Sequence, residues 1–334
     1  MMFDLPLIWA GIIAFAVFIY VVLDGFDLGI GILFPFAKKK EDRDVMMNTV
    51  APVWDGNETW LVLGGGGLYA VFPLVYSVAL TALYAPLTIM LLALVFRGVA
   101  FEFRFKDDAH RPIWDRAFIW GSYTATFFQG IVLGAFVQGI KVEGRSYAGG
   151  WFDWFTPFSI FTGFALIAGY ALLGACWLIY KTEGEIQYRF FRDAKRAGAL
   201  LVFSIIVASL WTPLLNDAIA DRWFSWPNIV LFLPVPVLVG VFTFLLFRAL
   251  LRRNENMPFL YALGLFFLSF TGLGISLFPY MIPPSIDIWE AASPDKSLSF
   301  LLVGTVVLVP MILAYTAYSY WVFRGKVRVE DGYH

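Results

Sequence analysis

Long apolar stretches recur along the whole chain and are separated by short polar segments. A helix needs about 20 mostly apolar residues to cross the hydrocarbon core of a membrane. Nine stretches meet this requirement, at residues 6–36, 53–73, 78–104, 114–140, 157–180, 194–216, 227–250, 257–280 and 298–323. The pattern predicts an all-α polytopic membrane protein with nine transmembrane helices, and no shift in composition divides residues 1–334 into more than a single integral membrane domain.

The order of the spans allows an internal repeat. Spans one to four and spans five to eight would cross the membrane in the same orientations, as in a parallel repeat. We therefore expect two four-helix bundles and one peripheral helix, although the two halves show no convincing sequence identity.

The composition supports a membrane protein and excludes other classes. Hydrophobic residues make up 60% of the chain and charged residues 15%, whereas soluble domains contain about 45–50% and about 25%. An ordinary soluble enzyme and a disordered chain are therefore excluded. The net charge of −1 provides no basic field, so we expect a lipid membrane around the chain and no nucleic-acid partner.

The basic residues indicate the orientation of the chain. Nineteen of the 24 Lys and Arg residues follow the first, third, fifth, seventh and ninth spans. Cytoplasmic loops carry such an excess, so we expect the N-terminus outside and the C-terminus in the cytoplasm. No Lys or Arg precedes the first span, which argues against a cleavable signal peptide.

Charged residues inside the spans are the main candidates for function, because charges are costly in the hydrocarbon layer. Six of them cluster in the first three spans: Asp24, Asp27, Asp55, Glu58, Arg97 and Glu102. By helical rise, Asp27 lies roughly 15 Å from the inner end of its span and Asp55 about 5 Å from it. All the acids fall in the cytoplasmic half, so we predict a proton relay open to the cytoplasm rather than a pore through the membrane.

Each of these residues also has a purely structural explanation. Asp55 lies in the first turn of a helix, where a carboxylate complements the helix dipole. Glu102 could be an interfacial acid paired with Arg97 or Arg104, and the two aspartates of the first span could form a structural ion pair with Arg97. The clustering across three spans favours function over these separate explanations.

Few side chains in the sequence could hold a metal or a heme. A single cysteine, Cys176, excludes a disulfide framework and a cysteine-based iron–sulfur or zinc site within this chain. His110 lies in a charged loop and is expected to be solvated, and His334 is the last residue. The glycine run 64–67 lacks the Lys and Ser/Thr of a phosphate-binding loop and predicts close helix packing instead.

Several motifs resemble subunit II of cytochrome bd-type quinol oxidases, in the same order and over essentially the whole length. The matching segments are 24–31 (DGFDLGIG), 51–61 (APVWDGNETWL), 70–73 (AVFP), 96–104 (FRGVAFEFR), 278–285 (FPYMIPPS) and 323–327 (FRGKV). The cyanide-insensitive subtype falls within this resemblance.

The resemblance implies a role in aerobic respiration. Such oxidases oxidise a membrane quinol and reduce dioxygen to water in the bacterial cytoplasmic (inner) membrane, which contributes to the proton motive force. It implies that a partner subunit I carries two hemes b, one heme d and the quinol site, and that this chain is its heme-free partner in a heterodimer. Some members also include a small accessory subunit or a structural quinone, and both remain open here.

The resemblance also assigns roles to particular residues. Asp27, Asp55 and Glu102 match positions of a cytoplasmic proton-uptake path, although a Glu at the last position is a mild departure. Trp60 matches a tryptophan associated with oxygen access. In the relay that we expect, Asp55 collects protons near Glu58 and Glu102, and Asp27 lies deeper in the membrane. Arg97 would anchor or tune the acids of this path, Asp24 among them.

Two other classes compete with this interpretation. A proton-coupled secondary transporter shares midmembrane acids and repeats, but the acids here crowd one side of the membrane. A non-catalytic anchor or assembly subunit would use the acids only to fix helix packing. Co-purification with a heme-bearing partner would separate the transporter from the oxidase subunit.

Overall fold

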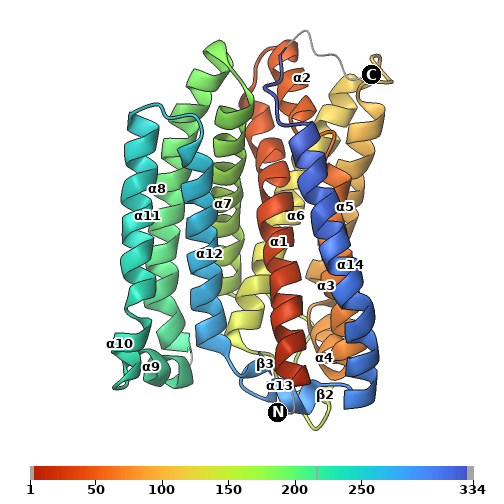
Figure 1. Cartoon of the computed structure of the whole chain (residues 1–334), viewed down its shortest axis with the longest axis vertical. Helices are drawn as coiled ribbons and strands as arrows, with labels where there is room; N and C mark the ends of the chain where they lie inside the picture. Colours follow the sequence, from red (N-terminus) through yellow and green to blue (C-terminus); the bar gives the residue numbers. More distant parts are fainter. Residues whose placement is uncertain (1–3, 216, 329–334) are drawn as a thin grey trace.

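The computed structural model describes residues 4–215 and 217–328, and long helices that run side by side make up most of it (Figure 1). Seven helical segments in this part of the chain are long and apolar enough to cross a membrane: Leu5–Phe36, Tyr84–Phe103, Pro157–Lys181, Gly184–Leu215, Asn228–Leu251, Met257–Leu277 and Asp295–Val322. The prediction of an all-α, multi-pass membrane protein is confirmed at this level.

The elements follow one another in a simple order. The helices are α1 (Leu5–Leu33), the 3-10 turn η1 (Phe34–Phe36), α2 (Lys40–Asn48), α3 (Trp54–Val71), α4 (Pro73–Ala82), α5 (Tyr84–Phe103), α6 (Arg111–Gln138), α7 (Pro157–Lys181), α8 (Gly184–Leu215), α9 (Asp217–Phe224), α10 (Asn228–Phe232), α11 (Pro234–Leu251), α12 (Met257–Leu277), α13 (Ile288–Ala291) and α14 (Asp295–Val322). Two antiparallel hairpins pair β1 (Val142–Glu143) with β2 (Ser146–Tyr147) and β3 (Tyr280–Ile282) with β4 (Ile286–Asp287).

The second and third predicted spans differ from the structure. Helices α3 and α4 are separated at Phe72 and bent by 120° relative to each other. Pro73 disfavours a helical conformation at the preceding residue, and Phe72 has φ −125° and ψ 64°. The prediction that the third span begins at residue 78 is therefore wrong, because residues up to Ala82 belong to α4 and α5 begins at Tyr84.

Other helix ends differ from the predicted ones by a few residues to a few turns. Helix α8 begins at Gly184 rather than 194, and the predicted end at 216 lies outside the described residues. Helix α6 has 28 residues, but it is not among the seven apolar spans.

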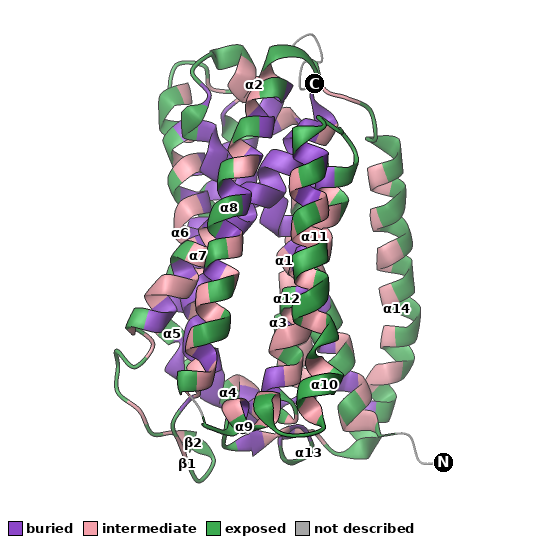
Figure 2. Ribbon diagram, turned by 90° about the vertical axis from the view of Figure 1, so that its left-hand side faces the viewer, coloured by how far each residue is buried: buried purple, intermediate pink, exposed green. Residues whose placement is uncertain are grey.

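Helices α1 and α7 form the centre of the molecule. A Cβ atom at Gly29 would lie 1.9 Å from the backbone oxygen of Tyr170, so only glycine permits this close approach. Figure 2 shows buried residues concentrated around these helices, whereas α14 stands apart and has one buried residue, Leu298.

The glycine run in α3 packs differently from the prediction. A Cβ atom added at Gly64 or Gly67 would meet side chains of α1 at ordinary contact distances, whereas one added at Gly65 or Gly66 would meet no described atom within 4 Å apart from its own stretch of helix. The tight helix contact therefore lies at Gly29, and part of the glycine run forms an open surface.

The two ends of the bundle are distinct. The hairpins lie at the end where α1 begins, which we call the hairpin end (Figure 1). Helix α2 lies at the opposite end, near the last turn of α14, and we call this the α2 end.

Candidate functional site

An arginine and two acids from three helices meet inside the bundle. The Arg97 guanidinium on α5 lies 2.5 Å from a carboxylate oxygen of Asp24 on α1 and 3.5 Å from one of Glu58 on α3. The side chains of Arg97 and Asp24 are 0% and 1% exposed, and that of Glu58 is 24% exposed. A buried charge requires such partners, because its desolvation is otherwise uncompensated.

Asp27 lies one turn further along α1 and is fully buried. Its carboxylate accepts a hydrogen bond of 2.8 Å from the Asn57 side-chain amide on α3. The Tyr320 hydroxyl on α14 donates to the Asn57 oxygen, also at 2.8 Å. The other Asp27 oxygen, Oδ1, has no hydrogen-bond partner among the described residues. We call Asp24, Asp27, Asn57, Glu58 and Arg97 the buried acid cluster.

Aromatic rings enclose the arginine. Trp54 and Phe101 stack with centroids 4.9 Å apart and planes 9° apart, and each ring centroid lies 5.9 Å from the Arg97 guanidinium carbon. Aromatic faces attract cations at this distance. The rings therefore stabilise Arg97 while keeping solvent away from it.

Asp55 and Glu102 do not join the buried acid cluster. Asp55 is exposed in the first turn of α3. Glu102 is exposed and pairs with Lys106 at 3.1 Å, so its expected pairing with Arg97 or Arg104 is wrong. Both acids lie on the helices of the cluster, near its α2 end, and are accessible from outside this chain.

Trp60 is buried on α3, beside Ala16 and Tyr20 of α1. The Phe15 ring packs edge-on against it with centroids 6.1 Å apart. The indole nitrogen has no hydrogen-bond partner among the described residues. Trp60 thus lies within the chain itself, on the hairpin-end side of Asp24 along α1.

A second charged group ties α2 to α5 and α6. Arg104, whose side chain is 0% exposed, lies 2.5 Å from Asp115 and 2.8 Å from Asp44. Arg43 binds the other oxygen of Asp115 at 2.8 Å, and Arg111 binds Asp44 at 2.6 Å. We call these five residues the ion-pair network.

Histidine and cysteine, two of the side chains that ligate heme iron, are rare in this chain. Heme iron binds His, Met, Cys or Tyr side chains in proteins. In the described part of the chain the histidine is His110, which is exposed and lies 3.0 Å from Asp107. Cys176 is buried, and no group of three or more His, Cys, Asp or Glu side chains among the described residues could hold a metal ion. His334 lies outside the described residues.

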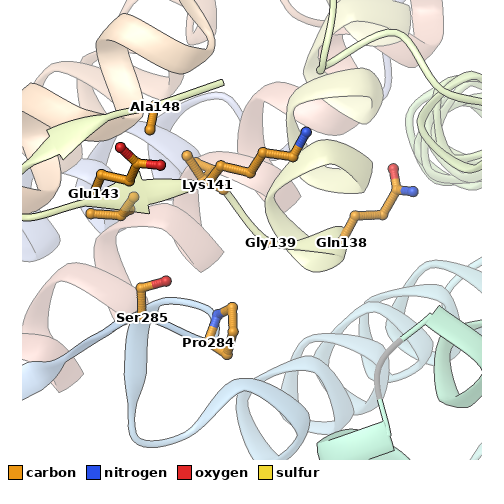
Figure 3. A pocket seen from close by; sticks show the side chains of 9 residues that line it. Gln138, Gly139, Lys141, Glu143, Ala148, Pro284 and Ser285 are labelled. Atoms are coloured by element: carbon orange, nitrogen blue, oxygen red, sulfur yellow. The ribbon is translucent and has the colours of Figure 1, made fainter. Parts of the chain in front are cut away.

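A hollow of about 480 Å³ opens at the hairpin end. Figure 3 shows Gln138, Lys141, Glu143 and Ser285 around it. Lys141 also pairs with Asp153 at 3.3 Å. This hollow lies at the opposite end from α2 and is separate from the buried acid cluster.

Sequence reasoning missed Asn57 and Tyr320. Asn57 lies in the first turn of a helix, where amides are common for local reasons. Tyr320 is 263 residues away from Asn57 and lies near the end of a helix, where interfacial tyrosines are frequent. No local pattern could have connected them to Asp27.

The buried acid cluster combines three carboxyl groups with one guanidinium. One positive charge cannot balance three negative charges, so this arrangement favours a variable number of bound protons. Such a group of acids can accept and pass on protons without any covalent chemistry.

Comparison with known proteins places the chain in a family. The sequence profile described as cytochrome bd terminal oxidase subunit II matches residues 5–323. The chain is 28% identical to cytochrome bd-I ubiquinol oxidase subunit 2 of Escherichia coli K12, over 98% of this chain and 96% of that protein. It is also 28% identical to cytochrome bd ubiquinol oxidase subunit 2 of Bacillus subtilis 168, over 97% of each. A chain in the structure of bd oxidase from Geobacillus thermodenitrificans has the same fold, with a TM-score of 0.79, 18% identity, and coverage of 96% of this chain and 99% of that one.

Proposed function

The chain belongs to the cytochrome bd terminal oxidase subunit II family, and from this membership we propose that its buried acid cluster delivers protons for the reduction of dioxygen. The chain is a subunit of a quinol:oxygen oxidoreductase complex, and its partner is subunit I. The observation that carries the proposal is that the buried Asp24 and Asp27 and the partly exposed Glu58 gather beside a single arginine, Arg97. A proton-coupled secondary transporter is not favoured, because the family is one of oxidase subunits.

The positions of the acids suggest the order of proton transfer. Asp55 and Glu102 are exposed near the α2 end and would collect protons. Glu58 is partly exposed and touches Arg97, so it would carry protons inward to Asp24 and Asp27. Reduction of one dioxygen to two waters consumes four protons, and uptake from the cytoplasm would add to the proton motive force.

We propose that the α2 end faces the cytoplasm. The excess of Lys and Arg in the loops at that end supports this orientation. With α6 and the bent pair α3–α4 each counted as one crossing, the seven apolar spans become nine. The N-terminus would then lie outside and the C-terminus inside, with α14 as the peripheral helix beside two four-helix bundles.

The same proposal places two hemes b, one heme d and the quinol site in subunit I. The family membership supports this division, and the histidine of the described residues, His110, is exposed. The open surface at Gly65 and Gly66 lets another helix approach α3 closely and is suited to contact with the partner. A structural quinone, an accessory subunit and oxygen access at Trp60 would be further features of such a complex.

The test replaces Asp27 by asparagine in the purified two-subunit complex. Asp27→Asn removes a proton-carrying group at constant size, so oxygen consumption with quinol should fall by about tenfold or more, a barrier increase of about 1.4 kcal/mol. Heme content, measured from the visible absorption spectrum, should stay unchanged.

Glu41→Gln is the matched control, because Glu41 is an exposed acid of α2 outside the cluster. It should leave turnover unchanged. Asp55→Asn should slow turnover less than Asp27→Asn, since exposed acids can replace one another at the entrance. Full turnover of Asp27→Asn with normal heme content would overturn the proposal.

A further inference from the structure

Asp27 is distinguished from the other buried acids by its partner. Asp24 and Glu58 lie against Arg97, whereas the side-chain partner of Asp27 is the neutral amide of Asn57. That amide is in turn held by Tyr320, which comes from a helix that otherwise packs loosely on the bundle. The chain of hydrogen bonds runs from α14 through α3 to α1.

The chemistry of the three groups fixes the direction of these hydrogen bonds. An ionised carboxylate can only accept, so the Asn57 nitrogen must face Asp27. The Asn57 oxygen then faces Tyr320, whose hydroxyl donates to it. In this arrangement each bond has one donor and one acceptor, and it favours the ionised form of Asp27.

The opposite direction is also fully satisfied once Asp27 carries a proton. If the proton sits on the Asp27 oxygen that faces Asn57, this O–H donates, and the amide turns by half a rotation and presents its oxygen to Asp27. The Asn57 nitrogen then donates to the Tyr320 oxygen, which can accept. A buried polar group that loses its partner is costly, so the amide is expected to follow a proton on this oxygen.

We propose that Tyr320 is a positioning residue that acts through Asn57, and that the orientation of this amide follows the protonation of the Asp27 oxygen that faces it. The proposal rests on the proton relay described above. In each cycle one proton enters the Asp27 carboxyl group and the same proton leaves it. Asn57 and Tyr320 exchange the direction of their hydrogen bonds but gain and lose no proton.

Two features hold Tyr320 in place. Its ring packs edge-on against Trp177 and Phe26, with centroids 6.0 and 6.4 Å away. Immediately after α14, residues 323–328 form a segment that we call the C-terminal strap. The Lys181 ammonium donates to the backbone oxygens of Phe323 and Gly325, and the Val327 N–H donates to the Lys181 oxygen at 2.8 Å.

The strap explains how a loosely packed helix can position a side chain accurately. Most of α14 is exposed, so its own packing does not fix the height of Tyr320. The contacts of Lys181 begin at Phe323, directly after the helix, and fix the end of α14 against α7. Contacts at the very end of the helix therefore hold Tyr320 beside Asn57.

The first experiment compares Tyr320→Phe with Tyr318→Phe in the purified two-subunit complex. Tyr320→Phe removes the hydroxyl but keeps the ring, and Tyr318 is an exposed tyrosine on the same helix. The readout is the infrared C=O band of the protonated Asp27 carboxyl, identified by its loss in Asp27→Asn. We expect Tyr320→Phe to shift or split this band and to lower turnover by about three- to tenfold, as for the loss of one hydrogen bond.

Tyr318→Phe should leave the band and turnover unchanged. An unaltered Asp27 band in Tyr320→Phe would overturn the inference, even if turnover fell, because a merely structural role would not require Asp27 to sense the hydroxyl.

A double-mutant cycle provides the second test. If Tyr320 acts through Asn57, adding Tyr320→Phe to Asn57→Ala should change turnover no further. Additive effects would overturn the inference. Should Tyr320→Phe reduce the yield of complex, the band is measured on the assembled fraction, and Asn57→Ala with Tyr320 intact must alter the Asp27 band as well.

The two proposals fail in different ways. Full turnover of Asp27→Asn would remove the relay and, with it, the role of Tyr320. Slow turnover of Asp27→Asn together with an unaltered Asp27 band in Tyr320→Phe would remove the positioning role alone.

Discussion

The buried acid cluster and the ion-pair network are made of the same kinds of side chain, yet their proportions are opposite. In the cluster, one guanidinium contacts Asp24 and Glu58, and a third carboxyl group, Asp27, binds a neutral amide. In the network, three guanidinium groups share Asp44 and Asp115, each of which contacts two arginines, and Arg111 also binds the exposed Asp108. We propose that the ratio of acids to bases among the buried groups, rather than their mere presence, separates a site for protons from a structural joint.

The physical reason is the excess of one sign of charge in each region. Each carboxylate of the network contacts two arginines, so its charge is compensated within the network. The network links α2, α5 and α6. In the buried acid cluster, acids outnumber bases, so binding a proton would reduce the repulsion between the carboxylates.

The largest expected effect comes from breaking the network at its buried member. Arg104→Met leaves Asp44 and Asp115 with less compensation, and removal of one partner of a buried pair costs about 3–5 kcal/mol. We expect a clearly lower thermal midpoint of the purified complex and unchanged turnover per assembled heme. Slower turnover at an unchanged thermal midpoint would show that the network is not simply structural.

A smaller effect, on turnover rather than on the thermal midpoint, is expected in the buried acid cluster. Arg97→Lys keeps the charge but replaces the planar fork by a point charge that cannot serve Asp24 and Glu58 together. Turnover should fall by about tenfold, a barrier increase of about 1.4 kcal/mol, with hemes retained. The matched change Arg111→Lys in the network should leave turnover unaffected, and equal losses in both variants would erase the distinction between the two regions.

The smallest effect is expected for an ion pair in water. Lys326 of the C-terminal strap lies 2.5 Å from Glu255, and this hydrogen bond lowers the pKa of Glu255 below its ordinary value of 4.5. The stabilisation is therefore present above pH 4.5 and is lost as the pH falls through the lowered pKa.

Glu255→Gln should accordingly change the thermal midpoint only slightly at pH 7, by the equivalent of about 1 kcal/mol or less. Well below the lowered pKa of Glu255, the variant and the parent chain should have the same midpoint. A larger effect at pH 7 would mean that exposed pairs matter here as much as buried ones.

The sequence was sufficient for the helices and for part of the site. Hydropathy located the spans, and the rarity of charge in them identified Asp24, Asp27, Glu58 and Arg97, which the structure brings into one region. The bend at Phe72 was missed because its effect depends on where α4 can pack, although Pro73 signalled a break. The pairing of Glu102 with Arg97 or Arg104 was wrong because a helix position at the membrane boundary does not say which way a side chain turns.

The neutral partners of Asp27 could not be predicted from the sequence. Charge marks a buried acid as unusual, but an amide or a phenol in a helix is ordinary. Asn57 and Tyr320 acquire their meaning only from a contact that joins distant parts of the chain.

The C-terminal strap also has a consequence for biosynthesis. The acids of the cluster are translated within the first third of the chain, but Tyr320 and the strap leave the ribosome near its end. Asn57 is therefore inserted in the bilayer before α14 has been made and before Lys181 binds the end of that helix. A nascent chain that stalls before this point contains Asp24, Asp27 and Glu58 but lacks the hydroxyl that orients Asn57, so the site is complete only after α14 has been made.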